Sequence, residues 1–401
     1  MLAAARMEAQ SAMALESTLE VLERGRQDGL HIGWQLYVSH RGEVVADTAG
    51  GESRPGTAMT TDSMMIWFSA TKAVTSVAAA QVWERGGFEL DDPVVRYVPE
   101  FGSHGKDAIT IRHLFTHTAG IRYADSPERG SGAAALAQSS GYSPFVSSWE
   151  ERRSRIMDAE IEPGWIPGQR AGYHPFSTMF LLAEIVQRLD GRPFSQYVRD
   201  EVFLPLGMAD CWIGMPSGAY RAYGDRIGVL HITRPGRGAM PFPRVDSEEG
   251  CAACTPAAGG RGPMNQFGRL YEAMLGHGAR DGARILSPQT AEAMVARHRV
   301  GMHDESFGVD LDWGLGFIVD AFNYGRYSSR RSFGHGGGQS SVGFADPEHG
   351  LVVALVMNGL PGPAAHYRRL DEVTARIYED LGIARAGDPG RTRPVPASGY
   401  Q

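Results

Sequence analysis

The sequence predicts an α+β fold in which one antiparallel sheet is flanked by helices. Strand-like apolar runs lie near both ends of the chain, at 32–39, 43–48, 311–319, 332–344 and 351–357. Helical patterns lie between and beside them, at 5–29, 176–189, 264–275, 288–298 and 366–381. Strands from opposite ends of a chain share one sheet when the segment between them is inserted. We therefore expect a sheet domain built from residues 1–121 and 264–385.

Residues 122–263 are the expected insertion, a helical and loop region that covers a cleft. The 122–165 part is polar and rich in Gly, Ser and Ala, and the 214–263 part contains six prolines, which is typical of a loop or lid. The last residues, 386–401, are rich in Pro, Gly and Arg and predict a mobile tail.

Composition restricts the class of protein. The 401 residues include 42% hydrophobic and 21% charged residues, and the net charge is −7. Because no basic stretch is long enough to follow a phosphate backbone, we expect no nucleic-acid partner. Arg6 and Glu8 interrupt what would be the apolar core of a signal peptide, and no later stretch reaches membrane-spanning length. The sequence therefore predicts a cytoplasmic protein that does not bind membranes.

Two short pairs of residues have both a chemical and a structural interpretation. Cys251 and Cys254 have the spacing of a redox pair or of half a zinc site, but no second pair at zinc-finger spacing accompanies them. His113 and His117 lie four apart, as in a metal pair, without the intervening Glu of a zinc-protease helix. We favour packing roles for both pairs and expect neither a metal nor a cofactor.

A Ser-x-x-Lys pair, Ser69 and Lys72, precedes a long run of small residues without helix breakers. On a helix these two side chains lie on the same face. A serine hydroxyl becomes a nucleophile when a base removes its proton, and a lysine is such a base only when it is uncharged. Burial lowers the pKa of a lysine. The pair alone is a weak signal, since an ordinary helix also contains such spacings.

Further motifs give the pair its context. They are the 112–120 stretch, Pro163-Gly164 before Tyr173, the 205–208 and 313–316 stretches, and His335-Gly336-Gly337 before 344–347. In this order they resemble the β-lactamase-related family over about residues 15–382. That family includes class C β-lactamases, D-amino-acid peptidases, serine carboxylesterases and some acyltransferases. The resemblance implies a β-lactamase/transpeptidase-like fold.

The resemblance also implies roles for individual residues. Ser69 matches the nucleophile that forms the acyl-enzyme, Lys72 matches its lysine partner, and Tyr173 matches a phenol that serves as general base and then acid. Near an ammonium group the phenolate is favoured, so Lys72 and Tyr173 should titrate as a unit. The backbone N–H groups of Ser69 and Gly338 match the oxyanion hole.

Other positions are candidates for substrate binding. His335, Gly336 and Gly337 match the Lys-Thr-Gly strand that lines the cleft. Close approach of a substrate explains consecutive glycines in a strand, for which a plain bulge is the alternative. His174 follows the proposed base, and Trp165 is a candidate for the wall of an acyl pocket, although both residue types are common in cores.

Two departures from the family pattern restrict the range of substrates that we expect. Pro175 replaces the asparagine of the Tyr-x-Asn motif and has neither a side-chain amide nor an N–H. His335 replaces a lysine and is mostly neutral at pH 7. Both changes argue against β-lactams and D-Ala-D-Ala peptides, and both suit a small ester or other acyl donor.

The sequence therefore favours hydrolysis of a small carboxylic ester through acyl-Ser69. The alternative is an acyltransferase that passes the acyl group to an amine or alcohol in natural-product biosynthesis. A β-lactamase, a D-amino-acid peptidase and a non-catalytic binding protein rank lower. The first half-reaction is common to hydrolase and transferase, so these residues do not separate the two.

Overall fold

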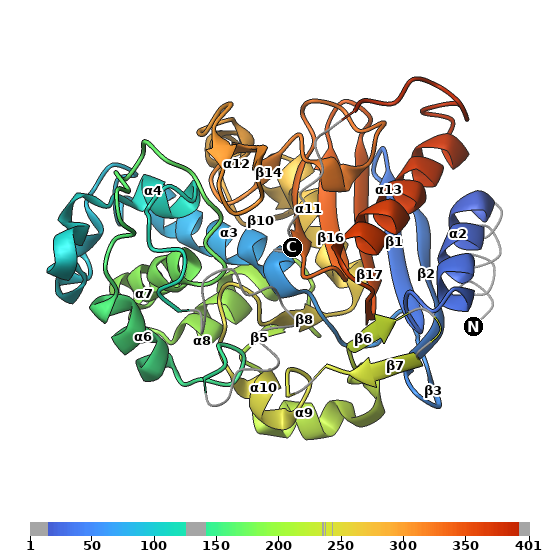
Figure 1. Cartoon of the computed structure of the whole chain (residues 1–401), viewed down its shortest axis with the longest axis horizontal. Coiled ribbons are helices and arrows are strands. Elements are labelled where there is room, and N and C mark those ends of the chain that lie inside the picture. The colour runs from blue at the N-terminus through green and yellow to red at the C-terminus, as the bar shows by residue number, and fades with distance from the viewer. Residues whose placement is uncertain (1–14, 126–141, 235, 237, 243, 393–401) are drawn as a thin grey trace.

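Strands from the two ends of the chain form one eight-stranded sheet (Figure 1). The computed structural model describes residues 15–125 and 142–392, apart from 235, 237 and 243. The strand order is β13-β14-β15-β16-β17-β1-β2-β3, and each neighbouring pair is antiparallel. The strands are β1 Gly33–His40, β2 Glu43–Arg54, β3 Thr57–Ala58, β13 Asp312–Trp313, β14 Ile318–Val319, β15 Phe333–Gly337, β16 Ser341–Asp346 and β17 Leu351–Met357. The predicted α+β class, with N- and C-terminal strands in one sheet, is confirmed.

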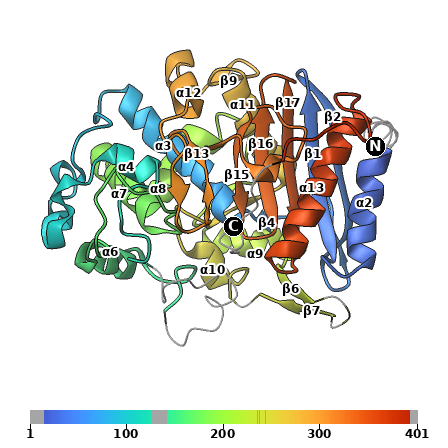
Figure 2. The same ribbon diagram turned by 45° about the horizontal axis from the view of Figure 1, so that its top comes forward.

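Both faces of the sheet are buried. In the fully buried strand β17, the side chains of Val353 and Leu355 join one apolar cluster, and those of Val352 and Ala354 join the other. Helices α2 (Glu16–Gln27) and α13 (Pro363–Asp380) lie side by side on the first face (Figure 2). Helix α11 (Met264–Leu275) packs on the second face, where α3 (Thr71–Glu84) and α7 (Ser177–Asp190) extend the core. The strand period of two thus divides the protein into two cores.

Two segments predicted as single strands are hairpins instead. The 311–319 run contains β13 and β14, and the 332–344 run contains β15 and most of β16. In the second run Gly338 and Gln339 have φ values of +46° and +61°, so the chain reverses there. The prediction was wrong because apolar and small residues continue through both turns, which hides the reversal from the periodic pattern.

The described part of the 214–263 segment contains short elements where we expected an irregular loop or lid. They are α9 Ser217–Tyr223, β6 His231–Arg234, β7 Gly238–Pro241, α10 Glu248–Ala252 and β8 Gly260–Gly262. Strand β6 pairs with β18 (Gly359–Leu360), and β8 pairs with both β4 (Met65–Ile66) and β5 (Trp212–Ile213). Prolines occupy the ends of these elements, as Pro216 and Pro263 do before α9 and α11, which explains why they did not prevent local order.

The remaining elements are short helices and β-bridge pairs. The helices are α4 Ile111–Phe115, α6 Trp149–Asp158, α8 Phe194–Val198 and α12 Pro288–Val295, and the strands are β9 Ala279–Arg280, β10 Ala283–Arg284, β11 His303–Asp304 and β12 Val309–Asp310. In the part of the chain that the structure describes, no helix has both the length and the apolar character needed to cross a bilayer. The predicted helix at 5–29 lies partly outside the described residues, and so does the tail beyond Thr392.

Candidate active site

Ser69 lies in a short 3₁₀-helix, η1 (Phe68–Ala70), which leads directly into α3. Phe68 has a φ of +47°, a conformation that is unfavourable for a side chain with a Cβ by about 1–2 kcal/mol. Contacts at the preceding residue hold this turn: Trp67 N donates to Gly260 O at 2.8 Å, and Ser341 Oγ donates to Trp67 O at 2.7 Å. Strands β8 and β16 therefore fix the backbone that presents Ser69.

The three predicted catalytic side chains meet at the Ser69 hydroxyl. Lys72 Nζ lies 3.2 Å from Ser69 Oγ, and Tyr173 OH lies 2.6 Å from the same atom. Lys72 comes from the first turn of α3, while Tyr173 comes from the segment before α7. Helices α3 and α7 pack against each other, and this contact brings the two motifs together.

The surroundings of Lys72 favour a neutral amine. Its Nζ donates to Pro175 O at 2.8 Å and to Ala257 O at 3.1 Å. Two carbonyls use two N–H groups, so an uncharged amine keeps its lone pair for the third neighbour, Ser69 Oγ. The side chain is buried, and burial holds the pKa of Lys72 well below its usual value. The position of Lys72 beside Ser69 Oγ and the lowered pKa of its amine are both compatible with the predicted role as a base.

Tyr173 is the opposite end of the same hydrogen-bonded chain. Burial raises the pKa of Tyr173 above its usual value, and the Asp304 carboxylate adds to this effect. Burial thus favours the protonated phenol at Tyr173 and the neutral amine at Lys72. The coupled titration of the two groups stays a prediction. The phenol O–H donates to Ser69 Oγ, and Lys72 Nζ lies within hydrogen-bond distance of the same oxygen. The arrangement allows one proton to move along each bond.

A buried ion pair behind the site holds Tyr173 in place, and sequence reasoning missed it. Asp304 Oδ1 accepts the Tyr173 N–H at 3.0 Å, while Asp304 Oδ2 lies 3.0 Å from Arg299 Nη2. The same Oδ1 accepts the N–H groups of Ser306 and Phe307 at 3.0 and 3.1 Å. An Asp two residues before a Ser is a common loop pattern, but nothing local connects it to a tyrosine 131 residues away.

Strand β15 brings His335, Gly336 and Gly337 beside these groups. The ring centroids of His335 and Tyr173 are 6.0 Å apart. His335 Nδ1 lies 2.6 Å from Gly336 O, so this nitrogen carries the proton and Nε2 keeps a lone pair. Burial is the main cause that lowers the pKa of His335, to about 3. The second cause, repulsion from Lys72, acts only when that amine is protonated. His335 is therefore neutral at pH 7.

The glycines after His335 allow the strand to approach the nucleophile. A Cβ on Gly337 would lie 2.0 Å from Trp67 O, and a Cβ on Gly338 would lie 2.3 Å from the Phe68 ring. Any larger residue would force β15 away from the turn that holds Ser69. The structure thus places the peptide between Gly337 and Gly338 against the residues that precede the nucleophile.

The other two candidates for substrate contact have supporting positions. His174 is buried, and its Nε2 accepts the N–H groups of Gly120 and Ile121, each at 3.1 Å. Trp165 Nε1 donates to Thr118 O at 3.0 Å. Both side chains hold the 118–121 segment, and the structure does not bring them to the Ser69 hydroxyl.

The Cys and His pairs also have structural surroundings. His113 Nδ1 accepts the Thr110 N–H at 3.2 Å as part of a helix cap, and His117 Nδ1 accepts the His174 N–H at 3.1 Å. Burial raises the pKa of Cys251 to about 11 and that of Cys254 to about 12, which disfavours the thiolate form that redox chemistry and metal binding need. Within the described ranges, no group of three or more His, Cys, Asp or Glu side chains is placed to hold a metal ion.

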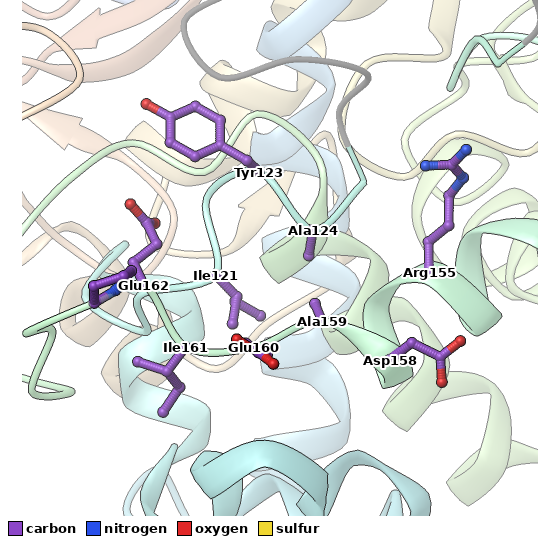
Figure 3. A pocket seen from close by; sticks show the side chains of 10 residues that line it. Ile121, Tyr123, Ala124, Arg155, Asp158, Ala159, Glu160, Ile161 and Glu162 are labelled. Carbon is purple, nitrogen blue, oxygen red and sulfur yellow. The ribbon is translucent and has the colours of Figure 1, made fainter.

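A cavity of about 470 Å³ lies on the insertion side of the molecule (Figure 3). Figure 3 shows its lining side chains, which come from the 121–124 segment and from residues 155–163. The Arg122–Glu162 ion pair, 2.6 Å long, stands at its edge. The lining contains none of the groups around the Ser69 hydroxyl, so this cavity is separate from the candidate active site.

Comparison with known proteins now decides the family. The chain matches the Beta-lactamase family over residues 19–375. This protein belongs to the beta-lactamase family. It is therefore a serine hydrolase of that family.

The similar proteins include named esterases. This beta-lactamase-family enzyme is 28% identical to Esterase/beta-lactamase LipL of Mycobacterium tuberculosis, over 84% of this chain and 79% of LipL. It is 26% identical to Esterase EstB of Burkholderia gladioli, over 89% of this chain and 94% of EstB. A penicillin-binding protein homologue from Caulobacter crescentus shares the fold with a TM-score of 0.72 at 27% identity, over 90% of this chain and 97% of that chain. The family match and the named esterases among similar proteins together indicate where this chain lies within the family.

Proposed function

We propose that this enzyme hydrolyses a small-molecule carboxylic ester, not a β-lactam, through an acyl-Ser69 intermediate. The observation that carries the proposal is the continuous chain from the Tyr173 O–H through Ser69 Oγ, at 2.6 Å, to Lys72 Nζ, at 3.2 Å. Because two carbonyls accept the two N–H groups of a neutral Lys72 amine, its lone pair is free to accept the serine proton in the proposed reaction. The named esterases among the similar proteins support the same reaction class.

During acylation, protons move along these hydrogen bonds from Tyr173 toward the substrate and from Ser69 to Lys72. Lys72 Nζ takes the Ser69 proton while Oγ attacks the ester carbonyl carbon. The backbone N–H groups of Ser69 and Gly338 hold the oxyanion that forms. When the C–O bond to the alcohol breaks, the Tyr173 phenol gives its proton to the departing oxygen. The acyl-enzyme then contains a Lys72 ammonium beside a Tyr173 phenolate, and the two opposite charges stabilise each other.

Deacylation returns every proton. The Tyr173 phenolate removes a proton from water, and the resulting hydroxide attacks the acyl carbon. As the bond to Ser69 Oγ breaks, the Lys72 ammonium gives its proton back to that oxygen. The products are a carboxylic acid and an alcohol, and the resting protonation states are restored.

Two positions disfavour a β-lactam. Pro175 has no N–H or amide to hold a β-lactam side chain, and its carbonyl already accepts from Lys72. His335 is neutral and buried, so it offers no cation for a substrate carboxylate. An ester without a carboxylate needs neither contact. The cytoplasmic location remains a prediction.

The test uses p-nitrophenyl acetate and butyrate with wild type, Ser69→Ala and Ser76→Ala. Ser76 is a buried serine of α3, seven residues after Ser69, and serves as the control. We expect Ser69→Ala to lose burst, turnover and labelling by a fluorophosphonate, while Ser76→Ala keeps them. Equal turnover by Ser69→Ala would show that the nucleophile is another group.

The same acyl-enzyme serves an acyltransferase, so the experiment includes acceptors. Acyl-Ser69 formed from the p-nitrophenyl ester is offered water alone and then water with a primary amine or a primary alcohol. For a hydrolase, the free acid remains the main product. If amide or ester dominates at millimolar acceptor, the enzyme is a transferase. Nitrocefin is included, and its turnover at the rate of the esters would contradict the exclusion of β-lactams.

A further inference from the structure

Arg369 of α13 is a buried cation that the reaction scheme does not use. Its side chain is 4% exposed. Among the described residues, no carboxylate lies within ion-pair distance of its guanidinium. Burial lowers the pKa of Arg369 to about 9, so it remains charged at pH 7. A buried charge without a counter-charge is costly, and it persists where its hydrogen bonds are needed.

The hydrogen bonds of Arg369 end on backbone carbonyls. Nη1 donates to Leu30 O at 2.6 Å, while Nη2 donates to Gly359 O at 2.6 Å and to Gln339 O at 2.7 Å. The Nδ1 atoms of His31 and His366 also face the two Nη atoms, at 3.2 and 3.4 Å. Of these partners, Gln339 belongs to the turn that joins β15 to β16.

That turn needs support because of its backbone conformation. Gly338 and Gln339 both have positive φ, +46° and +61°, and Ser340 N donates to Gly337 O at 2.8 Å. Gly337 pairs with Ser341, so Gly338, Gln339 and Ser340 form a three-residue connection whose first two positions are left-handed, a conformation that favours glycine. Glutamine at the second position is unfavourable by about 1–2 kcal/mol. A hydrogen bond from Arg369 to Gln339 O offsets that conformational cost.

The same turn sets the direction of one proposed oxyanion donor. The Gly338 N–H belongs to the same peptide unit as the Gly337 carbonyl. That carbonyl accepts Ser340 N at 2.8 Å and Ser340 Oγ at 3.2 Å. Donors on a carbonyl polarise its peptide and strengthen the N–H on the other side. A change in the turn would therefore both reorient and weaken the Gly338 donor.

We propose that Arg369 is a positioning residue for the oxyanion hole: it holds the left-handed Gln339 peptide so that the turn presents the Gly338 N–H toward the carbonyl attacked by Ser69. This inference rests on the proposed function, because it assigns a role in the same acyl transfer. Arg369 does not touch substrate. It acts through the turn.

The test is a rescue experiment on kcat. Arg369→Lys keeps the positive charge but has a single nitrogen in place of the two Nη donors. We expect kcat for p-nitrophenyl butyrate to fall at least about tenfold with little change in KM. Complete loss of an oxyanion donor typically lowers kcat by about 10²–10³. Gln339→Gly makes the left-handed position favourable without Arg369. The double variant should therefore recover kcat. Its melting temperature should rise only in part, because the glycine does not restore the bonds of Arg369 to Leu30 O and Gly359 O.

His277→Gly provides the matched control, because His277 is an exposed residue with a φ of +53° far along the chain from the turn. It should not restore kcat to Arg369→Lys. Hydrogen exchange of the peptide that contains residues 333–345 gives a second readout, with faster exchange at the turn expected in Arg369→Lys and slower exchange in the Gln339→Gly double variant. If kcat is unchanged in Arg369→Lys, or does not recover in the double variant, the inference is overturned.

Two further outcomes are separable. If Arg369→Lys does not fold, Gln339→Val replaces it, because a β-branched residue at this φ distorts the turn and leaves Arg369 in place. An unchanged kcat in Gln339→Val overturns the inference. Full ester turnover by Ser69→Ala contradicts the proposed function. If turnover depends on Ser69 but is unchanged in the Arg369 and Gln339 variants, only the role of Arg369 is contradicted.

Discussion

Replacing Asp304 by Asn should lower the free energy of unfolding while it leaves kcat nearly unchanged. The Arg299 and Asp304 side chains are 1% and 0% exposed, and their closest N–O distance is 3.0 Å. Asp304→Asn removes the charge and turns an amide N–H₂ or a weaker acceptor toward the guanidinium. Burial lowers the pKa of Arg299 only to about 10, so the cation remains and cannot escape by losing its proton at pH 7.

The expected loss of stability is about 3–5 kcal/mol, the range for removing one partner of a buried ion pair. Whole domains are stable by only about 5–15 kcal/mol, so this change is large. Catalysis should respond differently. An Asn Oδ1 can still accept the N–H groups of Tyr173, Ser306 and Phe307. We therefore expect kcat to stay within about threefold of wild type, whereas Asp304→Ala, which removes the acceptor, should also lower kcat.

Urea unfolding followed by tryptophan fluorescence measures the first effect, and p-nitrophenyl butyrate turnover measures the second. Asp310→Asn is the control, because Asp310 is a nearby carboxylate that is 67% exposed. It should change the free energy of unfolding by less than about 0.5 kcal/mol. A loss below about 1 kcal/mol in Asp304→Asn would refute the energetic argument. A loss of kcat equal to that of Asp304→Ala would show that the charge, and not the hydrogen bond to Tyr173, supports catalysis.

Two shorter predictions concern proton transfer. Tyr173→Phe removes the hydroxyl 2.6 Å from Ser69 Oγ and keeps the ring, so kcat should fall by about 10²–10⁴-fold. Circular dichroism should show that the variant is folded. Acylation at the wild-type rate would exclude the phenol as proton donor. The active form needs uncharged Lys72, whose pKa burial lowers, so kcat/KM should fall as pH drops through that lowered pKa and level off above it. Because the pKa of His335 is about 3, His335→Asn should keep this acid limb, and its disappearance in that variant would contradict the assignment to Lys72.

The sequence determined those parts of the protein that local pattern encodes. The buried run 351–357 and the helix at 264–275 have the predicted bounds because packing periodicity is continuous there. Ser69 and Lys72 meet because i and i+3 of a helical segment share a face, which needs no tertiary information. The order of the motifs was sufficient to indicate the family and to predict that Tyr173 lies beside Ser69.

The tertiary structure decided the chemical state of these residues. The charge of Lys72 depends on burial and on carbonyls 103 and 185 residues away, and the position of Tyr173 depends on Asp304, 131 residues away. The placement of His174 as a support of the 118–121 segment has the same origin. Backbone carbonyls carry no side-chain signature, and contacts between distant segments follow no period. A sequence therefore names the groups that can react, while the packing of α3, α7 and β15 fixes which of them carries the proton.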